Sequence, residues 1–270
     1  MNGDSVDLKY DCLKKILARY ESMLVAFSGG VDSTFLLKAA MDAQIGRVLA
    51  VTFAGELFSP GEAAEAAELA RFLGAEHLIV ENSDLGNPTF AGNPPDRCYH
   101  CKKNEYGKLM ELAHKSGIST VADGTNADDI DDYRPGIRAG QELGIVSPLK
   151  EAGFTKEEIR AVSRKLGLPT ADKPASPCLA SRFPYGIKIT AEALKQVGAA
   201  ETIIRKMGIP VVRVRHHGDL ARIEVPGEHL HLIVERAAEV ERELKNLGYT
   251  YAALDLRGYR MGSMNETLKR

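Results

Sequence analysis

The fold is decided by the stretch 23-MLVAFSGGVDST-34, in which a short apolar run leads directly into two glycines, an aspartate and a serine. This order predicts a buried strand, a phosphate-binding loop and a helix over residues 35–43. Gly29 and Gly30 can adopt backbone torsions closed to other residues, so that successive N–H groups converge on one anion. Asp32 and Ser33 are good N-caps for the helix, whose positive N-terminal end adds to the attraction for phosphate. We therefore expect this loop to bind a phosphate group.

The loop lacks the lysine of the G-x-x-x-x-G-K-[ST] pattern, which argues against a site built for transfer of a γ-phosphate. Its S-G-G-x-D-S pattern resembles that of the PP-loop ATP pyrophosphatases, which split ATP between the α- and β-phosphates and adenylate an oxygen of their substrate. The alternative is a plain glycine turn between a strand and a helix, but a seven-residue match in this context argues against it. The resemblance implies that the nucleotide is bound by Ser28, Gly29, Gly30, Val31, Asp32, Ser33 and Thr34.

The composition is that of an ordinary globular protein, with 44% hydrophobic and 27% charged residues in a chain of 270. This length suffices for one large and one small domain. A net charge of -2 argues against a broad nucleic-acid surface, because such surfaces need clustered cations. The first residues lack the basic start and apolar core of a signal peptide, and no apolar run approaches the ~18 residues of a membrane span. We expect a cytoplasmic protein without nucleic-acid or membrane partners.

The first half of the chain alternates predicted strands and helices. A helical apolar stripe over 6–22 places Cys12 in the core, and the uniformly apolar run 48–53 predicts a buried parallel strand. A capping box with a proline opens a helix over 59–73, and a strand follows at 77–80. The order β-α-β-α-β predicts a doubly wound, mainly parallel α/β sheet, Rossmann-like in type, with ligands at the carboxyl ends of its strands.

A proline- and glycine-rich loop, residues 82–97, delivers Cys98 and Cys101 to the start of a helix that reaches about Lys115. Loops of this length are usually functional. A helix N-terminus favours thiolate, so both sulfurs are candidate reactive groups or metal ligands. Cysteines in a cytoplasmic chain suggest a metal, a cluster or reactive thiols before structural disulfides.

The next predicted strand, residues 120–123, ends in G-T-N-A-D-D at 124–129. This segment occupies the same carboxyl edge as the phosphate loop, where carboxylates can hold Mg²⁺ against pyrophosphate. An Asx-rich turn is the simpler alternative. The nucleotide contacts expected from this segment are Gly124, Thr125 and Asn126, and the expected Mg²⁺ ligands are Asp32 and Asp129.

The second half begins with a capping box at 155–158 and continues through a proline-rich connection to C-L-A-S-R-F-P-Y-G at 178–186. We place the domain boundary at residue 187, giving domains 1–186 and 187–270. The remainder is too short for a second Rossmann unit and predicts a small α+β domain. Its expected elements are a helix at 191–207, a hairpin of strands 211–215 and 221–225, a helix at 228–247 and a strand at 251–256.

Arg213 and Arg215 lie two apart on the first strand of that hairpin, so their side chains project from one face. Two guanidinium groups on one face suit a phosphate, whereas the alternative is a solvated edge strand that carries charge against aggregation. His216 and His217 resemble turn residues, and we assign them no metal.

Together these motifs closely resemble the LarE family over nearly the whole chain, and C-L-A-S-R-F-P-Y-G is the most specific of them. The resemblance implies a sulfur transferase that adenylates a carboxylate of pyridinium-3,5-biscarboxylic acid mononucleotide and converts it to a thiocarboxylate, toward the nickel-pincer nucleotide of lactate racemase. It also implies a homo-oligomer, with a hexamer as one form, and leaves the sulfide source unidentified. We expect Arg213 and Arg215 to bind the 5′-phosphate of the substrate, and Ser181 and Arg182 to contact its carboxylate end.

The resemblance also bears on the source of sulfur. A carboxylate is a poor electrophile, and transfer of AMP supplies a leaving group so that a sulfur nucleophile can attack. One branch of the family uses a lone cysteine equivalent to Cys178 as a sacrificial donor. A second branch has three cysteines that hold a [4Fe-4S] cluster, and Cys98, Cys101 and Cys178 place this chain there. A persulfide or disulfide relay, a zinc site and no joint role are the alternatives.

Three other functions compete with this hypothesis. A PP-loop tRNA thiolase shares the phosphate loop and can carry a cluster, but the acidic pI argues against it. An amidoligase related to NAD synthetase has no use for three cysteines. A module that only senses ATP does not need the apparent Mg²⁺ chemistry of Asp32, Asp128 and Asp129.

Overall fold

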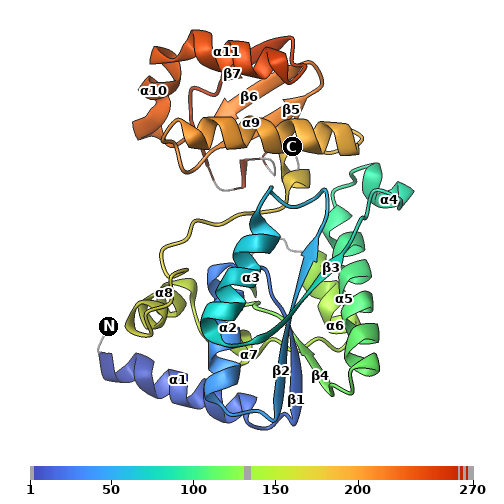
Figure 1. Cartoon of the computed structure of the whole chain (residues 1–270), viewed down its shortest axis with the longest axis vertical. Helices are drawn as coiled ribbons and strands as arrows, with labels where there is room; N and C mark the ends of the chain where they lie inside the picture. Colours follow the sequence, from blue (N-terminus) through green and yellow to red (C-terminus); the bar gives the residue numbers. More distant parts are fainter. Residues whose placement is uncertain (1–2, 131–134, 261, 264–265, 267–270) are drawn as a thin grey trace. The chain divides into compact units, whose positions relative to one another are not determined.

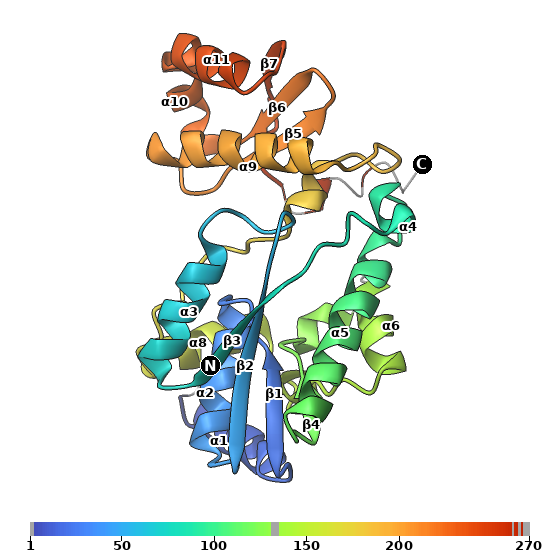
Figure 2. The same ribbon diagram turned by 45° about the vertical axis from the view of Figure 1, so that its right-hand side comes forward.

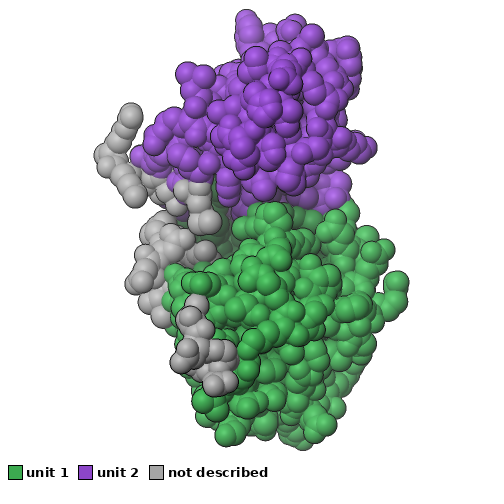
Figure 3. All heavy atoms as spheres, turned by 90° about the vertical axis from the view of Figure 1, so that its left-hand side faces the viewer, with its two compact units in different colours: residues 1–55, 61–84, 96–176 green, residues 56–60, 85–95, 177–270 purple. Residues whose placement is uncertain are grey.

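The computed structural model describes residues 3–130, 135–260, 262–263 and 266. The chain forms two compact units, which Figure 3 shows in different colours. The predicted domain limits, 1–186 and 187–270, stay a prediction, and residues 177–186 group with the second unit. The first unit comprises residues 1–55, 61–84 and 96–176, and the second comprises residues 56–60, 85–95 and 177–270.

The first unit alternates strands and helices as predicted. Its elements are α1 (Gly3–Leu17), β1 (Ser22–Ala26), α2 (Val31–Asp42), β2 (Arg47–Ala54), α3 (Glu62–Leu73), β3 (Glu76–Glu81), α5 (Arg97–Lys115), β4 (Thr120–Ala122), η1 (Ala127–Ile130), α6 (Pro135–Glu142), α7 (Pro148–Glu151) and α8 (Lys156–Lys165).

The four strands form one parallel sheet in the order β3-β2-β1-β4 (Figure 1). Val25 of β1 lies between Ala50 of β2 and Ala122 of β4. All four carboxyl ends therefore lie at one edge of the sheet, the edge at which β1 runs into the S-G-G-V-D-S-T loop.

Successive residues of β1 serve two separate hydrophobic cores. Met23 and Val25 pack into the core with α1, α2, α3 and α8, whereas Leu24 packs into the core with α5 and α6. Figure 2 shows these helix groups on opposite sides of the strands. The prediction of a doubly wound α/β sheet is confirmed, since both faces of the parallel sheet are covered.

The second unit is a small α+β assembly around a three-stranded sheet in the order β5-β6-β7. β5 pairs antiparallel with β6, and β6 pairs parallel with β7. Val214 of β5 and Ile223 of β6 pack against the helices of this unit. Its elements are α4 (Pro88–Ala91), η2 (Leu179–Arg182), α9 (Ala191–Lys206), β5 (Arg213–His217), β6 (Leu220–Glu224), η3 (Gly227–His229), α10 (Leu230–Glu235), α11 (Ala237–Asn246) and β7 (Tyr251–Leu254).

Outside the phosphate loop, four local predictions were wrong. Cys12 is exposed, because the buried stripe of α1 runs through Leu13 and Leu17 instead. Helix α3 begins at Glu62 with Gly61 as its N-cap in the left-handed region (φ 90°), which excludes the expected capping box. The helix predicted over 228–247 is divided into α10 and α11, because Arg236 leaves the helical region with φ -105° and ψ 22°.

The fourth concerns His216 and His217, which are the last two residues of β5 and not part of the turn. His216 stacks on Phe183 with ring centroids 4.9 Å apart, and its Nδ1 lies 3.3 Å from the Tyr249 hydroxyl. Within the described ranges, no helix combines the length and the apolar character needed to cross a bilayer.

Candidate functional site

The phosphate loop is held open by two serine hydroxyls. Gly29 has φ +65°, and a Cβ placed on it would lie 3.2 Å from the Ala66 Cβ of α3, so only glycine fits without strain. The Gly30 N–H donates to Ser28 Oγ at 3.3 Å, and the Ser28 N–H donates to Ser33 Oγ at 3.3 Å. Hydrogen bonds of this length are weak, so phosphate oxygens can replace the hydroxyls.

The N-cap of α2 is Gly30, and no side chain accepts a hydrogen bond at this cap in the described structure. The prediction that Asp32 and Ser33 cap the helix was therefore wrong. The absence of a side-chain cap favours phosphate binding, because the backbone N–H groups at the start of α2 can then donate to a ligand.

The segment after β4 meets the start of α2 at the carboxyl edge of the sheet. A Cβ placed on Gly124 would lie 3.1 Å from the backbone N of Ser33 and 3.2 Å from the Asp32 Cβ, so the two loops touch. Thr125 is fixed by Asp123, whose Oδ1 accepts the Thr125 N–H at 3.1 Å and whose Oδ2 accepts its hydroxyl at 2.9 Å. The phosphate loop and the G-T-N-A-D-D segment therefore lie next to each other in the first unit, as expected.

The same segment also contains the Asx turns that were its simpler explanation. The Asn126 N–H donates to Asp129 Oδ2 at 3.0 Å, and the Asp128 N–H donates to Asn126 Oδ1 at 2.9 Å. Asn126 and Asp129 are buried. These hydrogen bonds and their burial therefore fix the side chains of Asn126 and Asp129 within the turn.

The residues present fit a Mg²⁺ ion best at Asp32. Its Oδ1 is buried and accepts no hydrogen bond within the described part of the chain, and its Oδ2 lies 2.5 Å from Lys156 Nζ. A buried carboxylate oxygen without a donor is costly and suits a hard cation. The roles of Asp32 and Asp129 as Mg²⁺ ligands stay predictions.

Two lysines at this edge escaped the sequence analysis. Lys156 is the first residue of α8 and directly follows the N-cap Thr155, whose predicted capping box with Glu158 is confirmed. Besides its ammonium contact with Asp32, its backbone N–H donates to Asp128 Oδ2 at 2.8 Å. Lys173 reaches the phosphate loop from the connection after α8, where its Nζ lies 3.2 Å from the Gly29 carbonyl oxygen. Only the capping box gave a sequence signal near either lysine.

Cys98 and Cys101 lie in the first turns of α5, as predicted. Cys98 is exposed and Cys101 is half-buried. The Cys101 thiol donates to Asp84 Oδ2 at 3.3 Å and to Glu105 Oε1 at 3.6 Å. These three ligand atoms lie within 4.8 Å of one another and are the one group of this kind found among the described residues.

Both carboxylates beside Cys101 are buried and anchored. Asp84 accepts from Asn82 Nδ2 at 3.1 Å and from Asn104 Nδ2 at 2.6 Å, and Glu105 pairs with Lys102 at 2.7 Å. The sequence analysis missed Asp84 and Glu105, because the first lies in the irregular loop and the second lies one helical turn beyond Cys101.

Cys178 belongs to the second unit, where it precedes η2 and is half-buried. Its position is fixed through Leu179, whose backbone N–H donates to the Leu57 carbonyl at 2.8 Å. A joint site of Cys98, Cys101 and Cys178 stays a prediction, since these cysteines belong to different units.

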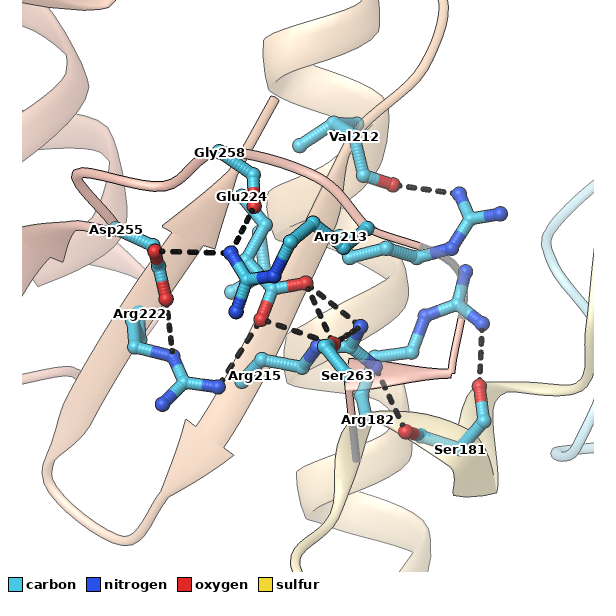
Figure 4. A network of polar contacts seen from close by, with 12 residues as sticks. Ser181, Arg182, Val212, Arg213, Arg215, Arg222, Glu224, Asp255, Gly258 and Ser263 are labelled. Atoms are coloured by element: carbon cyan, nitrogen blue, oxygen red, sulfur yellow. Dashed lines mark hydrogen bonds and ion pairs between the residues drawn. The ribbon is translucent and has the colours of Figure 1, made fainter. Parts of the chain in front are cut away.

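The predicted substrate residues of the second unit form a dense network (Figure 4). Arg182 is fully buried, and its Nε and Nη2 both donate to the Glu201 carboxylate at 2.8 Å. Burial raises the pKa of Glu201, but the hydrogen bonds and charge of Arg182 and the charge of Arg205 outweigh it, so this pKa lies below its ordinary value. Glu201 also accepts the Val214 N–H at 3.0 Å, which ties α9 to the edge strand β5.

Arg215 is committed to contacts within the unit. It donates from Nη2 to Glu224 at 2.6 Å and to Ser263 Oγ at 2.9 Å, and from Nη1 to the Ser181 carbonyl at 2.9 Å. Its Nε is buried without a hydrogen-bond partner in the described structure. Arg215 therefore keeps one donor for a ligand.

Arg213 donates to the Val212 carbonyl at 2.7 Å and lies over the Tyr259 ring, 5.1 Å from its centroid. Burial and the nearby charge of Arg182 lower the pKa of Arg213. Arg213 and Arg215 are each 5% exposed, so the alternative of a solvated edge strand was wrong. We call Arg182, Arg213, Arg215, Glu201 and Glu224 the arginine cluster.

Comparison with known proteins gives clear relatives, although no protein-family model matches the chain. The chain is 43% identical over 250 residues to pyridinium-3,5-bisthiocarboxylic acid mononucleotide synthase of Lactiplantibacillus plantarum, covering 92% of this chain and 90% of the relative. It is 42% identical over 265 residues to an uncharacterized protein of Synechocystis, covering 97% and 99%. A tRNA-specific 2-thiouridylase of Caldanaerobacter subterraneus is 28% identical over 198 residues, covering 57% and 53%.

Proposed function

The chain belongs to the LarE family of sulfur transferases, and on this premise we propose that it uses ATP to convert a carboxylate of pyridinium-3,5-biscarboxylic acid mononucleotide to a thiocarboxylate. The observation that carries the proposal is the 43% identity over 92% of the chain to the synthase of the bisthiocarboxylic product. An ATP pyrophosphatase loop on the carboxyl edge of a parallel sheet supports it. The far lower identity and coverage of the tRNA thiolase make thiolation of tRNA the weaker alternative.

The first step is activation of the carboxylate. Gly30 and the first N–H groups of α2 would bind the phosphates of ATP, and Asp32 with Asp129 would hold Mg²⁺, which neutralises pyrophosphate as it leaves. The substrate carboxylate attacks the α-phosphorus and the bond to pyrophosphate breaks. AMP then becomes the leaving group when sulfur attacks the carbonyl carbon.

The arginine cluster is proposed to bind the other half of the substrate. Arg213 and Arg215 offer charge-assisted hydrogen bonds to its 5′-phosphate, for which the donor left on Arg215 Nε is an observed reason. Ser181 and Arg182 are proposed to contact the carboxylate end of the substrate. Because all three guanidinium nitrogens of Arg182 donate hydrogen bonds within the unit, its part is to hold Ser181 and the neighbouring backbone in place.

Sulfur is proposed to arrive through a [4Fe-4S] cluster on Cys98, Cys101 and Cys178. The donor set fits, since three thiols leave one iron without a protein ligand, and when bound the cluster would supply that iron for a transferable hydrosulfide. The group of Asp84, Cys101 and Glu105 supports a competing use of Cys101 in a site for a single metal ion. The chain is further proposed to act as a homo-oligomer, with a hexamer among the forms that light scattering would distinguish.

Product analysis tests the reaction. Anaerobically prepared protein with ATP, Mg²⁺ and the mononucleotide should form AMP and pyrophosphate, together with a product in which sulfur has replaced oxygen. Pyrophosphate should not form without the carboxylate substrate. Formation of ADP and phosphate, or thiolation of added tRNA in place of the mononucleotide, would refute the proposal.

The cluster is tested by absorption, iron and acid-labile sulfide in four proteins. Cys98→Ala, Cys101→Ala and Cys178→Ala should each lose the cluster and sulfur transfer but still bind ATP, whereas Cys12→Ala, the exposed control, should lose nothing. A single metal ion at Cys101 predicts instead that Asp84→Asn loses metal and Cys178→Ala retains it. Loss of H₂S mass from Cys178 in protein without iron would indicate a sacrificial cysteine.

A further inference from the structure

The segment 171–176, which follows α8, is hydrogen-bonded to the rest of the first unit near both of its ends. Arg160 donates to the carbonyl oxygens of Ala171 and Lys173, at 2.5 and 2.9 Å. Three residues later, Ser176 Oγ donates to Glu62 Oε1 at 2.5 Å, at the start of α3. Lys173 is therefore held at a fixed place between α8 and α3, and its side chain starts beside the phosphate loop.

The Lys173 ammonium group contacts the loop itself. Its Nζ lies 3.2 Å from the carbonyl oxygen of Gly29 and 3.2 Å from Glu65 Oε2. Gly29 is the residue whose left-handed backbone turns the neighbouring N–H groups toward one point. An ammonium on the carbonyl of that residue stands close to any anion that those N–H groups bind.

The two lysines at this edge are held with very different strength. Lys156 forms a short ion pair with Asp32, whose side chain is 25% exposed. Lys173 has one long contact with a neutral carbonyl and one with Glu65, whose side chain is 62% exposed and so screened by water. An ammonium group has three N–H donors, so Lys173 can turn to a phosphate at small cost.

We propose that Lys173 binds the β,γ-pyrophosphate portion of ATP in the phosphate loop and thereby favours ATP over AMP. This inference rests on the proposed function, because it needs ATP to bind at residues 28–34. Lys173 supplies from a distant part of the sequence the positive charge that a lysine within the loop supplies in other phosphate loops. It acts on the end of the nucleotide that leaves as pyrophosphate.

Titration calorimetry with ATP, AMP and inorganic pyrophosphate tests the proposal on the full-length protein. Lys173→Met should weaken binding of ATP and pyrophosphate by about tenfold or more, with AMP binding changed less than about twofold. Lys173→Arg should restore most of the ATP affinity. Lys165→Met is the control, because Lys165 also forms an ion pair with an exposed carboxylate, that of Asp7, and it should leave all three affinities unchanged.

An equal loss for ATP and AMP, or no loss, would overturn the proposal and leave Lys173 a support of the Gly29 backbone. Should Lys173→Met fail to fold, Glu65→Gln decides, because release of Lys173 should leave ATP binding as tight as before or tighter, and weaker binding would refute the role. Failure of the wild-type protein to bind ATP would overturn the proposed function as well. Equally tight ATP binding by the wild type and by Lys173→Met would refute the role of Lys173 and leave the proposed function standing.

Discussion

The phosphate loop of the first unit and the arginine cluster of the second are both proposed to bind phosphate, yet they are built in opposite ways. The loop uses backbone N–H groups, two of which donate long hydrogen bonds of 3.3 Å to serine hydroxyls. The arginine cluster uses buried guanidinium groups, of which Arg182 and Arg215 are already paired with the fully buried Glu201 and Glu224. In the loop, a phosphate would therefore replace weak hydrogen bonds of the backbone N–H groups. In the arginine cluster, it would add to ion pairs that already stabilise the fold.

The comparison predicts that the largest loss of folding stability comes from replacing Arg182. Arg182→Ala leaves the buried Glu201 with the partly exposed Arg205 as its ion-pair partner, and loss of one partner of a buried ion pair costs about 3–5 kcal/mol. Urea unfolding should show a loss of this size. Arg205→Ala, the control at the exposed side of the same carboxylate, should cost about 1 kcal/mol or less. Equal losses would mean that Arg182 is not the main partner of Glu201.

The next effect is on substrate binding. Arg213→Ala should weaken binding of the mononucleotide by about tenfold or more, since a hydrogen bond to a charged group contributes about 1.5–3 kcal/mol. ATP binding should hardly change. Arg215→Ala should also weaken substrate binding but in addition lose stability, because it removes one of the two arginines that form ion pairs with the buried Glu224 in the described structure. Similar losses for ATP and substrate would place these arginines in folding and not in a phosphate site.

A smaller effect is expected in the phosphate loop. Gly29→Ala forces a Cβ into the left-handed region and against Ala66, which costs about 1–2 kcal/mol and disturbs the N–H groups that bind ATP. Gly74→Ala is the matched control, because Gly74 has φ +73° with no atom within 4 Å of a Cβ. Both variants should lose stability in urea, but only Gly29→Ala should lose ATP affinity. Unchanged ATP binding in Gly29→Ala would exclude this loop as the nucleotide site.

The smallest effect is a pH dependence of stability. The pKa of Glu201 is lowered in the folded protein, so the stability that its charge contributes is present above the unfolded pKa of about 4.3 and is lost as pH falls through the lower folded value. Unfolding free energies from about pH 6 to pH 3 should fall less steeply in Glu201→Gln than in the wild type. Parallel curves would show that Glu201 does not titrate with unfolding.

The local features were predictable because each depends on a few neighbouring residues. The apolar run of β1, the glycines of the loop and the capping box at Thr155 each specify their structure locally, and all were found. Cys12 was misjudged because a stripe at helical spacing has edges that the sequence does not mark. The start of α3 was misjudged because Gly61 adopts a left-handed backbone that displaces the serine cap.

The sequence by itself determined that the chain folds as a parallel α/β sheet, that ATP is the expected nucleotide and that the chain belongs among sulfur transferases, because strand order and the phosphate loop are written in local patterns. Only the tertiary structure decided which partner each of these charged or polar side chains contacts. The pairing of Arg182 with Glu201, the contact of Cys101 with Asp84 and the contact of Lys173 with Gly29 join residues 17 to 144 positions apart. Such pairs depend on the packing of whole elements, and no pattern of neighbouring residues records them.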